Sequence, residues 1–153
     1  MKYEIERRIK SKLKDLPERL LKNTLAVGLF GSIARDDFNP RSDIDIFIIG
    51  EKDFSLDEQH IFYSFFYNIL RRDFKRDITI LTYSFAGLKR VPTWHTLHLC
   101  KDAYLIYERG ITNDVFKKIL EEAEKQGIIW DEEEKVFRIK EPKIRRRVKF
   151  EFS

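Results

Sequence analysis

The chain has little of three things: cysteine, long apolar runs and repetitive sequence. Its single cysteine, Cys100, excludes a disulfide within the chain and favours an intracellular protein. No apolar run approaches the roughly 20 residues that cross a bilayer. The charged start, Met1 to Glu4, is unlike a signal peptide. We therefore expect a cytoplasmic protein without a membrane partner, folded as one domain with a short appendage.

Charge is abundant. Charged residues make up 37% of the chain, with a net charge of +4, whereas about a quarter is usual for soluble domains. The excess of Lys and Glu suits a heat-adapted protein with surface ion pairs. Seven basic residues against one acidic residue gather between Arg138 and Lys149. This basic tail is expected either to contact RNA phosphates or to form a solvated edge.

Apolar periodicity predicts alternating helices and strands. In chain order we expect a helix over 2–22 broken at Pro17, a strand over 25–30, a short helix over 33–35, strands over 43–49, 77–82 and 103–107, and helices over 56–74 and 114–126. The expected fold is α/β (α+β), with a small, mixed, twisted sheet flanked by helices. Residues 85–93 are expected to be a loop or a broken helix.

The end of the chain predicts a separate appendage. Residues 136–139 and 148–152 both alternate apolar with polar side chains around Glu141-Pro142, which predicts a β-hairpin. We divide the chain into a domain over 1–127, with its core at 25–126, and a basic appendage over 128–153.

Two aspartates open the predicted strand over 43–49. Side chains alternate along a strand, so Asp43 and Asp45 face the same side. Two carboxylates there repel each other unless a cation lies between them. Mg²⁺ prefers such oxygen ligands, and two ions about 3.5–4 Å apart can hold both oxygens of an in-line displacement. The pair therefore predicts a divalent-metal site.

A third carboxylate is expected from a neighbouring strand. Asp77 opens the strand over 77–82 and is the candidate for a metal ligand and general base. Asp73 is its nearest competitor, but it lies among basic residues, which favours a solvated position. A strand-edge role without chemistry is the alternative for Asp77.

Gly31 and Ser32 lie where a predicted strand turns into a short helix. Helix N-termini favour phosphate, and a glycine lets the backbone approach a ligand closely. Ser32 can donate its hydroxyl to a phosphate oxygen, or it can simply cap the helix.

These residues together resemble a known signature. Gly31-Ser32-Ile33-Ala34-Arg35, followed by Ser42-Asp43-Ile44-Asp45-Ile46, is similar to the motif of minimal nucleotidyltransferases of the DNA-polymerase-β superfamily. Asp77-Ile78-Thr79-Ile80 looks like the third acidic strand of that family, and the resemblance covers roughly residues 25–126. The family has a glycine where this chain has Asp36. The shape of that turn is therefore open, and Arg35 either contacts the nucleotide or forms a surface salt bridge.

The resemblance implies a polymerase-β-like fold and an enzyme. Its reaction would move a nucleoside monophosphate from a nucleoside triphosphate to a hydroxyl, with release of pyrophosphate. ATP is the expected donor. Two Mg²⁺ ions, or Mn²⁺ in their place, would be the cofactors. The implied site residues are Asp43, Asp45 and Asp77 as catalytic metal ligands, with Gly31, Ser32 and Arg35 binding the nucleotide.

The resemblance also implies a partner, because minimal nucleotidyltransferases often accompany HEPN-type proteins. This chain would then be an antitoxin that modifies its HEPN toxin. The alternative is a non-catalytic module that binds a nucleotide or neutralises such a partner by binding alone.

Three other patterns are set aside. Arg90 and His95 match the loose R-x-x-x-x-H pattern of HEPN ribonucleases, but Pro92 interrupts the helix that pattern needs. His95, His98 and Cys100 lack a second pair of zinc ligands, which favours structural histidines. The aromatic stretch over 62–67 is expected to pack on the sheet, with a band wide enough to cover a partner interface as well.

Overall fold

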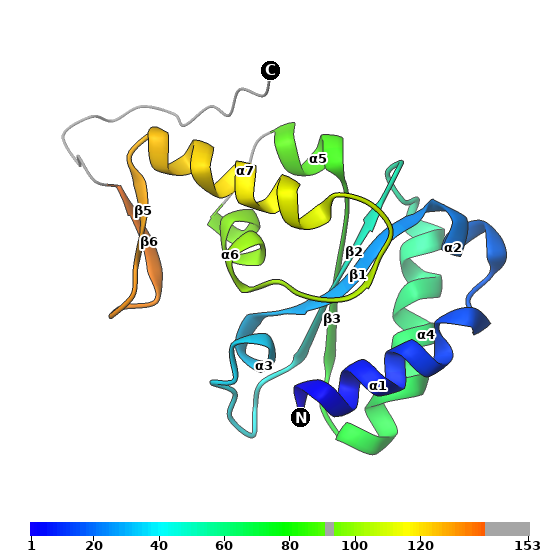
Figure 1. Cartoon of the computed structure of the whole chain (residues 1–153). Helices are drawn as coiled ribbons and strands as arrows, with labels where there is room; N and C mark the ends of the chain where they lie inside the picture. The colour runs from blue at the N-terminus through cyan, green and yellow to red at the C-terminus, as the bar shows by residue number, and fades with distance from the viewer. Residues whose placement is uncertain (91–93, 140–153) are drawn as a thin grey trace.

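The computed structural model describes residues 1–90 and 94–139 (Figure 1). The helices are α1 (Lys2–Lys12), the 3-10 turn η1 (Leu13–Asp15), α2 (Glu18–Asn23), α3 (Gly31–Arg35), α4 (Leu56–Phe74), α5 (Phe85–Arg90), α6 (Trp94–Asp102) and α7 (Thr112–Lys125). The strands are β1 (Thr24–Phe30), β2 (Ile44–Gly50), β3 (Ile78–Ser84), β4 (Tyr104–Glu108), β5 (Ile128–Asp131) and β6 (Val136–Ile139). The predicted α/β class is confirmed.

The main sheet is small and mixed. Its strand order is β3-β2-β1-β4, with β2 and β3 parallel and the other pairs antiparallel. Parallel neighbours need a crossover connection, which α4 supplies between β2 and β3 (Figure 1). This connection brings the starts of β2 and β3 to one edge of the sheet. The predicted acidic residues lie at that edge.

The side chains of β2 alternate between the two faces of the sheet and contribute to a separate hydrophobic core on each face. Ile44, Ile46 and Ile48 pack with α1 and α4 residues on one face. Phe47 and Ile49 pack with α6 and α7 residues on the other. Figure 1 shows these helix layers on opposite sides of the strands. By the same alternation, Asp43 and Asp45 belong to the α6 face.

The predicted interruption of the N-terminal helix is confirmed. Pro17 has extended backbone with ψ of 134° and precedes α2 as its N-cap. A proline nitrogen carries no hydrogen to donate, so the first helix ends before it. Leu16 and Leu20 stay buried on either side of the break, and the two helical pieces therefore share one core.

Helix α4 begins and ends where the sequence predicts. Ser55 and Glu58 form a capping box, in which the Ser55 hydroxyl accepts from Glu58 N and the Glu58 carboxylate accepts from Ser55 N. Lys75 closes the helix in the left-handed region at φ of 54°. Buried Phe62, Phe66 and Leu70 hold the helix on the sheet.

The predicted strand over 136–139 is present as β6, and it pairs with Ile128–Asp131, a strand that the sequence did not predict. The second predicted strand, 148–152, lies outside the described residues, so its pairing stays a prediction. The Asp131 carboxylate accepts from Glu133 N and Glu134 N, and these hydrogen bonds stabilise the tight turn that joins β5 to β6. Ile128 is buried in the α6 and α7 core, and Arg138 pairs with Asp131 at 2.7 Å. The RNA contact predicted for the basic tail stays a prediction.

A second difference concerns α6, where the sequence predicted no helix. Four of its residues are buried: Thr96, Leu97, Leu99 and Cys100. Packing against α7 and β1 therefore stabilises a segment of modest helix propensity. Across the described residues, no helix has the length and apolar character needed to span a membrane.

Candidate active site

The acidic pair lies at the start of β2, between β1 and β3. Asp45 is in register with Phe30 on β1 and with Thr79 on β3. The Thr79 hydroxyl donates to Asp43 Oδ2 at 3.4 Å. Asp43 is exposed, whereas Asp45 is half-buried. Three oxygen-bearing side chains from two strands therefore gather at one edge of the sheet.

Gly31 forms the back of this site. Its φ is +73°, a conformation that side chains rarely adopt. A Cβ at this position would overlap Asp45 Oδ2 and lie 3.2 Å from Asp45 Cγ. The turn after β1 therefore touches the carboxylate through bare backbone. Both the torsion and the close approach require a glycine.

Asp45 is electrostatically strained. Burial, followed by the charge of Asp43, raises the pKa of Asp45 from 3.8 to about 6, against the opposing effects of Thr79 and Arg35. A half-buried carboxylate beside a second one is favoured by a cation, and its oxygens are hard ligands of the kind that Mg²⁺ selects. The donor set of Asp43, Asp45 and Thr79 thus fits a divalent metal.

Asp77 is close in the backbone but turned away in its side chain. Its carbonyl accepts from Ile44 N at 2.9 Å, beside Asp43. Its carboxylate is 81% exposed and lies 3.8 Å from Arg71 Nε on α4. Within the described ranges, no group of three His, Cys, Asp or Glu residues is placed to hold a metal. The predicted triad is therefore not assembled.

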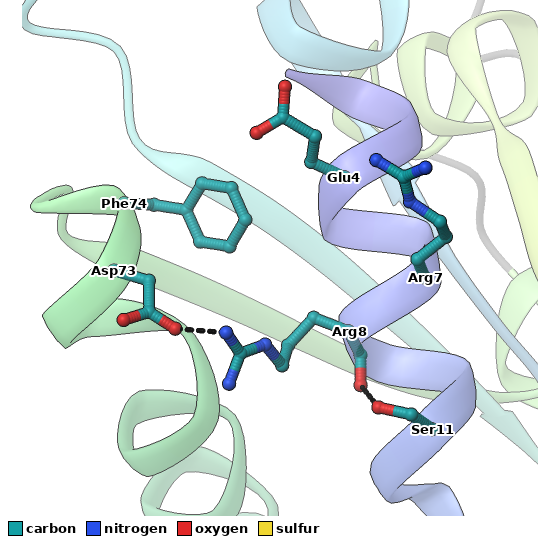
Figure 2. Close-up of a pocket in the computed structure, with 6 residues that line it drawn as sticks. All are labelled: Glu4, Arg7, Arg8, Ser11, Asp73 and Phe74. Carbon is teal, nitrogen blue, oxygen red and sulfur yellow. Dashed lines mark hydrogen bonds and ion pairs between the residues drawn. The ribbon is translucent and has the colours of Figure 1, made fainter.

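Asp73, the competitor of Asp77, forms an ion pair with Arg8 instead. The pair lies in an open cleft of about 430 Å³ between α1 and the end of α4 (Figure 2). Glu4 and Arg7 also line the cleft, so its charges balance. None of the predicted site residues lies in it. Asp73 is a partly exposed ion-pair residue, whereas the sequence favoured a solvated position without a partner.

Ser32 does not cap the short helix. The N-cap of α3 is Phe30, without a side-chain cap. Ser32 is half-buried, and its hydroxyl makes no hydrogen bond to the described part of the chain. Its role in binding phosphate stays a prediction, with the capping alternative removed.

Arg35 forms the salt bridges that were its alternative role. It lies 3.0 Å from Asp37 and 2.6 Å from Asp102 at the end of α6. Although burial opposes the charge, these two carboxylates raise the pKa of Arg35. The Asp102 side chain is only 4% exposed, and its burial raises its own pKa despite Arg35. The pair joins the α3 turn to α6.

Asp36 occupies the position where the family has glycine, and its backbone is left-handed, with φ of 62° and ψ of 28°. Asp tolerates this region better than most side chains, and Lys2 Nζ binds its carboxylate at 3.0 Å. At this departure from the signature, the backbone is in the left-handed region that glycine enters most easily.

Sequence reasoning missed Arg76. Its guanidinium donates to the carbonyls of Asn39 and Ser42, both at 2.8 Å, and lies over the Phe38 ring at 5.2 Å. The loop that leads into Asp43 is therefore held from the start of β3. Nothing in the sequence pairs Arg76 with this loop. Thr79 could have been found, because it shares strand parity with Asp77.

The histidines of α6 are structural in their contacts. His98 packs edge-on against Trp130 and Phe137 of the β5–β6 hairpin, with ring centroids 5.6 and 5.2 Å apart. Burial lowers the pKa of His98. His95 lies edge-on to Phe30 at 6.2 Å, and Cys100 is buried. These contacts support the structural interpretation.

Fold and site together define a three-layer α/β protein with paired carboxylates beside a glycine turn. A family model described as "Nucleotidyltransferase domain" matches residues 6–100. The chain belongs to this nucleotidyltransferase domain family, as the signature predicted. None of the curated proteins compared with the chain matches its sequence.

Three of the matches among solved structures have low identity and TM-scores below 0.5. A chain from a toxin–antitoxin crystal structure with AMP-PNP has a TM-score of 0.49 and 15% identity, over 78% of this chain and 93% of that one. A putative nucleotidyltransferase from Sulfolobus solfataricus has a TM-score of 0.37 and 22% identity, over 70% and 86%. A chain from the complex of tri-AMPylated Shewanella oneidensis HEPN toxin with MNT antitoxin has a TM-score of 0.44 and 12% identity, over 82% and 94%. The family assignment rests on the sequence match.

Proposed function

We propose that this nucleotidyltransferase is metal-dependent and moves a nucleoside monophosphate from a nucleoside triphosphate to a hydroxyl. The first candidate is AMP, transferred from ATP. The carrying observation is the half-buried Asp45, pressed against Gly31 and beside Asp43 at the sheet edge. Burial and mutual repulsion oppose two neighbouring negative charges, so a bound cation would stabilise them. Mg²⁺ usually binds nucleotide phosphates together with protein carboxylates.

Asp43 and Asp45 would hold the ions, and Thr79 would fix the Asp43 carboxylate through its hydroxyl. Mg²⁺ or Mn²⁺, when bound, would neutralise charge on the phosphates and on the leaving pyrophosphate. Because Gly31 has no side chain, the triphosphate could approach its backbone closely. The Ser32 hydroxyl, which makes no hydrogen bond within the described residues, would donate to a phosphate oxygen. Orientation and charge neutralisation would supply most of the rate.

Asp77 would complete the site by leaving Arg71. An exposed ion pair at 3.8 Å is weak, and the Asp77 backbone already lies beside Asp43. Turned inward, its carboxylate would accept the proton of the attacking hydroxyl. Arg35 would stay with Asp37 and Asp102 and orient the turn, with the nucleotide contact as its second role.

We further propose that the acceptor is a side-chain hydroxyl of a HEPN-type protein, with this chain as the antitoxin. The signature shared with minimal nucleotidyltransferases supports this choice. The alternative, neutralisation by binding alone, predicts that a protein lacking the acidic pair still protects cells from such a partner.

The test uses purified protein, each radiolabelled nucleoside triphosphate, Mg²⁺ or Mn²⁺, and a purified HEPN-type protein or a lysate of the source organism. The variant is Asp43→Ala with Asp45→Ala, and Glu121→Gln on α7 is the matched acidic control. We expect label in a protein band with wild type and Glu121→Gln only. No transfer from any donor, together with no metal-dependent nucleotide binding by calorimetry, would overturn the proposal.

A further inference from the structure

Helix α4 carries an uncharged surface in a highly charged protein. Although 37% of the chain is charged, residues 59–70 contain no Asp, Glu, Lys or Arg. One side of this stretch is buried on the sheet through Phe62, Phe66 and Leu70. The opposite side is solvent-exposed, where charged residues would be expected on a helix of this kind.

Large side chains form one stripe along this exposed side, which we name the α4 stripe: Leu56, His60, Tyr63 and Tyr67. Spacings of four, three and four residues place them on one helical face. Leu56 is 73% exposed, Tyr63 44% and Tyr67 42%. The two tyrosine rings stack, with centroids 5.9 Å apart and planes at 28°. Tyrosine-rich, charge-depleted faces are typical of protein interfaces.

The two ends of α4 carry opposite charges. Asp57 and Glu58 lie in the first turn, and Arg71 and Arg72 lie in the last, followed by Lys75. Asp57 lies in the first turn beside the stripe, and Lys75 is the C-cap that directly follows the last helical residue. Neither forms an ion pair with another described residue. If a second α4 helix lay antiparallel to this one, the acidic end of each helix would therefore lie beside the basic end of the other.

We propose that the α4 stripe binds a second copy of this chain, with the two α4 helices antiparallel about a two-fold axis. In such a pair the same surface meets itself. Tyr63 of one copy then faces Tyr67 of the other near the axis. The same flanks also face each other, so Asp57 of each copy lies beside Arg71 and Lys75 of the other. The uncharged centre excludes like-charge repulsion at the axis.

This arrangement leaves the acidic site accessible. The stripe lies on the helix layer of α1 and α4, whereas Asp43 and Asp45 face the α6 layer. One helix face is a small interface, so the dimer is expected to dissociate on dilution. The inference is independent of the transfer reaction. A HEPN-type partner seated on the same stripe would be a different occupant.

The first test is the mass of the full chain by sedimentation and light scattering across a concentration series. We expect a monomer–dimer equilibrium that Tyr63→Ala with Tyr67→Ala weakens at least about tenfold, the equivalent of 1.4 kcal/mol. Ile111→Ala, which removes an exposed apolar side chain elsewhere, is the control and should leave the equilibrium unchanged. Circular dichroism checks that each variant is folded.

A charge-reversal cycle tests the antiparallel register. Asp57→Lys and Lys75→Asp should each weaken the dimer about tenfold, and the double variant should recover most of the loss. Asp suits position 75, which is left-handed. Three outcomes overturn the proposal: a monomer at every concentration, a dimer indifferent to these changes, or stripe variants that lose only a HEPN-type partner.

Discussion

The α-carbon of Gly31 faces the carboxylate of Asp45 so closely that a Cβ there would lie 3.2 Å from Asp45 Cγ. Gly31→Ala should therefore displace the carboxylate and strain the φ of +73° together. We expect it to lower the free energy of unfolding by about 1–3 kcal/mol and to abolish metal-dependent nucleotide binding. Chemical denaturation and calorimetry measure the two effects.

Gly110→Ala is the matched control for this change. Gly110 also has a positive φ, of +149°, but nothing lies within 4 Å of its virtual Cβ. It should lose stability through strain alone and keep nucleotide binding. Equal binding losses in both variants would contradict the role given to Gly31.

Removing the charge of Asp45 should stabilise the metal-free protein. Folding raises the pKa of Asp45 from 3.8 to about 6, so the folded state holds the proton more tightly. The resulting stability is fully present below the unfolded pKa and is lost as pH rises through 6. At pH 7.5, Asp45→Asn should unfold at a free energy about 1–3 kcal/mol higher than wild type without metal.

Thermal melts between pH 4 and 8 test this directly. The gap between Asp45→Asn and wild type should open as pH rises through 6, and saturating Mg²⁺ should close it by stabilising the wild type alone. A gap that is constant with pH, or unaffected by Mg²⁺, would show that Asp45 carries no such strain.

Arg76 should control metal affinity through the loop before Asp43. Arg76→Ala removes both 2.8 Å hydrogen bonds to the Asn39 and Ser42 carbonyls. We expect Mn²⁺ to bind about tenfold more weakly by titration, with stability falling by about 1–3 kcal/mol. Arg72→Ala, an exposed neighbour, is the control, and Arg76→Lys should recover part of the affinity. Unchanged Mn²⁺ binding would reduce Arg76 to a structural role.

Position 36 should tolerate glycine but not a β-branched residue. Asp36 is left-handed and bound to Lys2. Asp36→Gly relieves the torsion and loses the ion pair, so stability should change by less than about 1 kcal/mol. Asp36→Val should cost about 1–3 kcal/mol. Urea denaturation compares the two, and similar losses in both would refute the conformational argument.

Local patterns predicted most of the framework. The acidic strand and α4 were visible because alternation and helical spacing each lie within a single segment. The capping box at Ser55, which marks the start of this helix, was recognised only in the structure. The two-core arrangement follows from β2, whose apolar side chains alternate between faces.

Contacts between distant segments were not predictable. The orientation of the Asp77 side chain toward Arg71, only six residues earlier, was not predictable either, because residue spacing does not encode how the α4–β3 junction turns. Helix α6 was missed because its stability comes from packing, and Asp102 was missed with it. The pairing of Val136–Ile139 with Ile128–Asp131 was not predicted, although the short turn between these strands closes at a small entropic cost.

The ion pair of Arg35 with Asp102 joins residues 67 positions apart. The β1–α3–β2 unit is contiguous in sequence, so its glycine turn and paired carboxylates close small loops and can form early in folding. Helix α6 follows α4, β3 and α5 in the chain, so its contact with α3 closes a much longer loop. During synthesis, the two aspartates thus emerge from the ribosome well before the segment that carries Asp102. A chain that ended between Asp45 and Asp102 would expose the acidic edge of the sheet. The packing of α6 against α3 is therefore the step that completes this region.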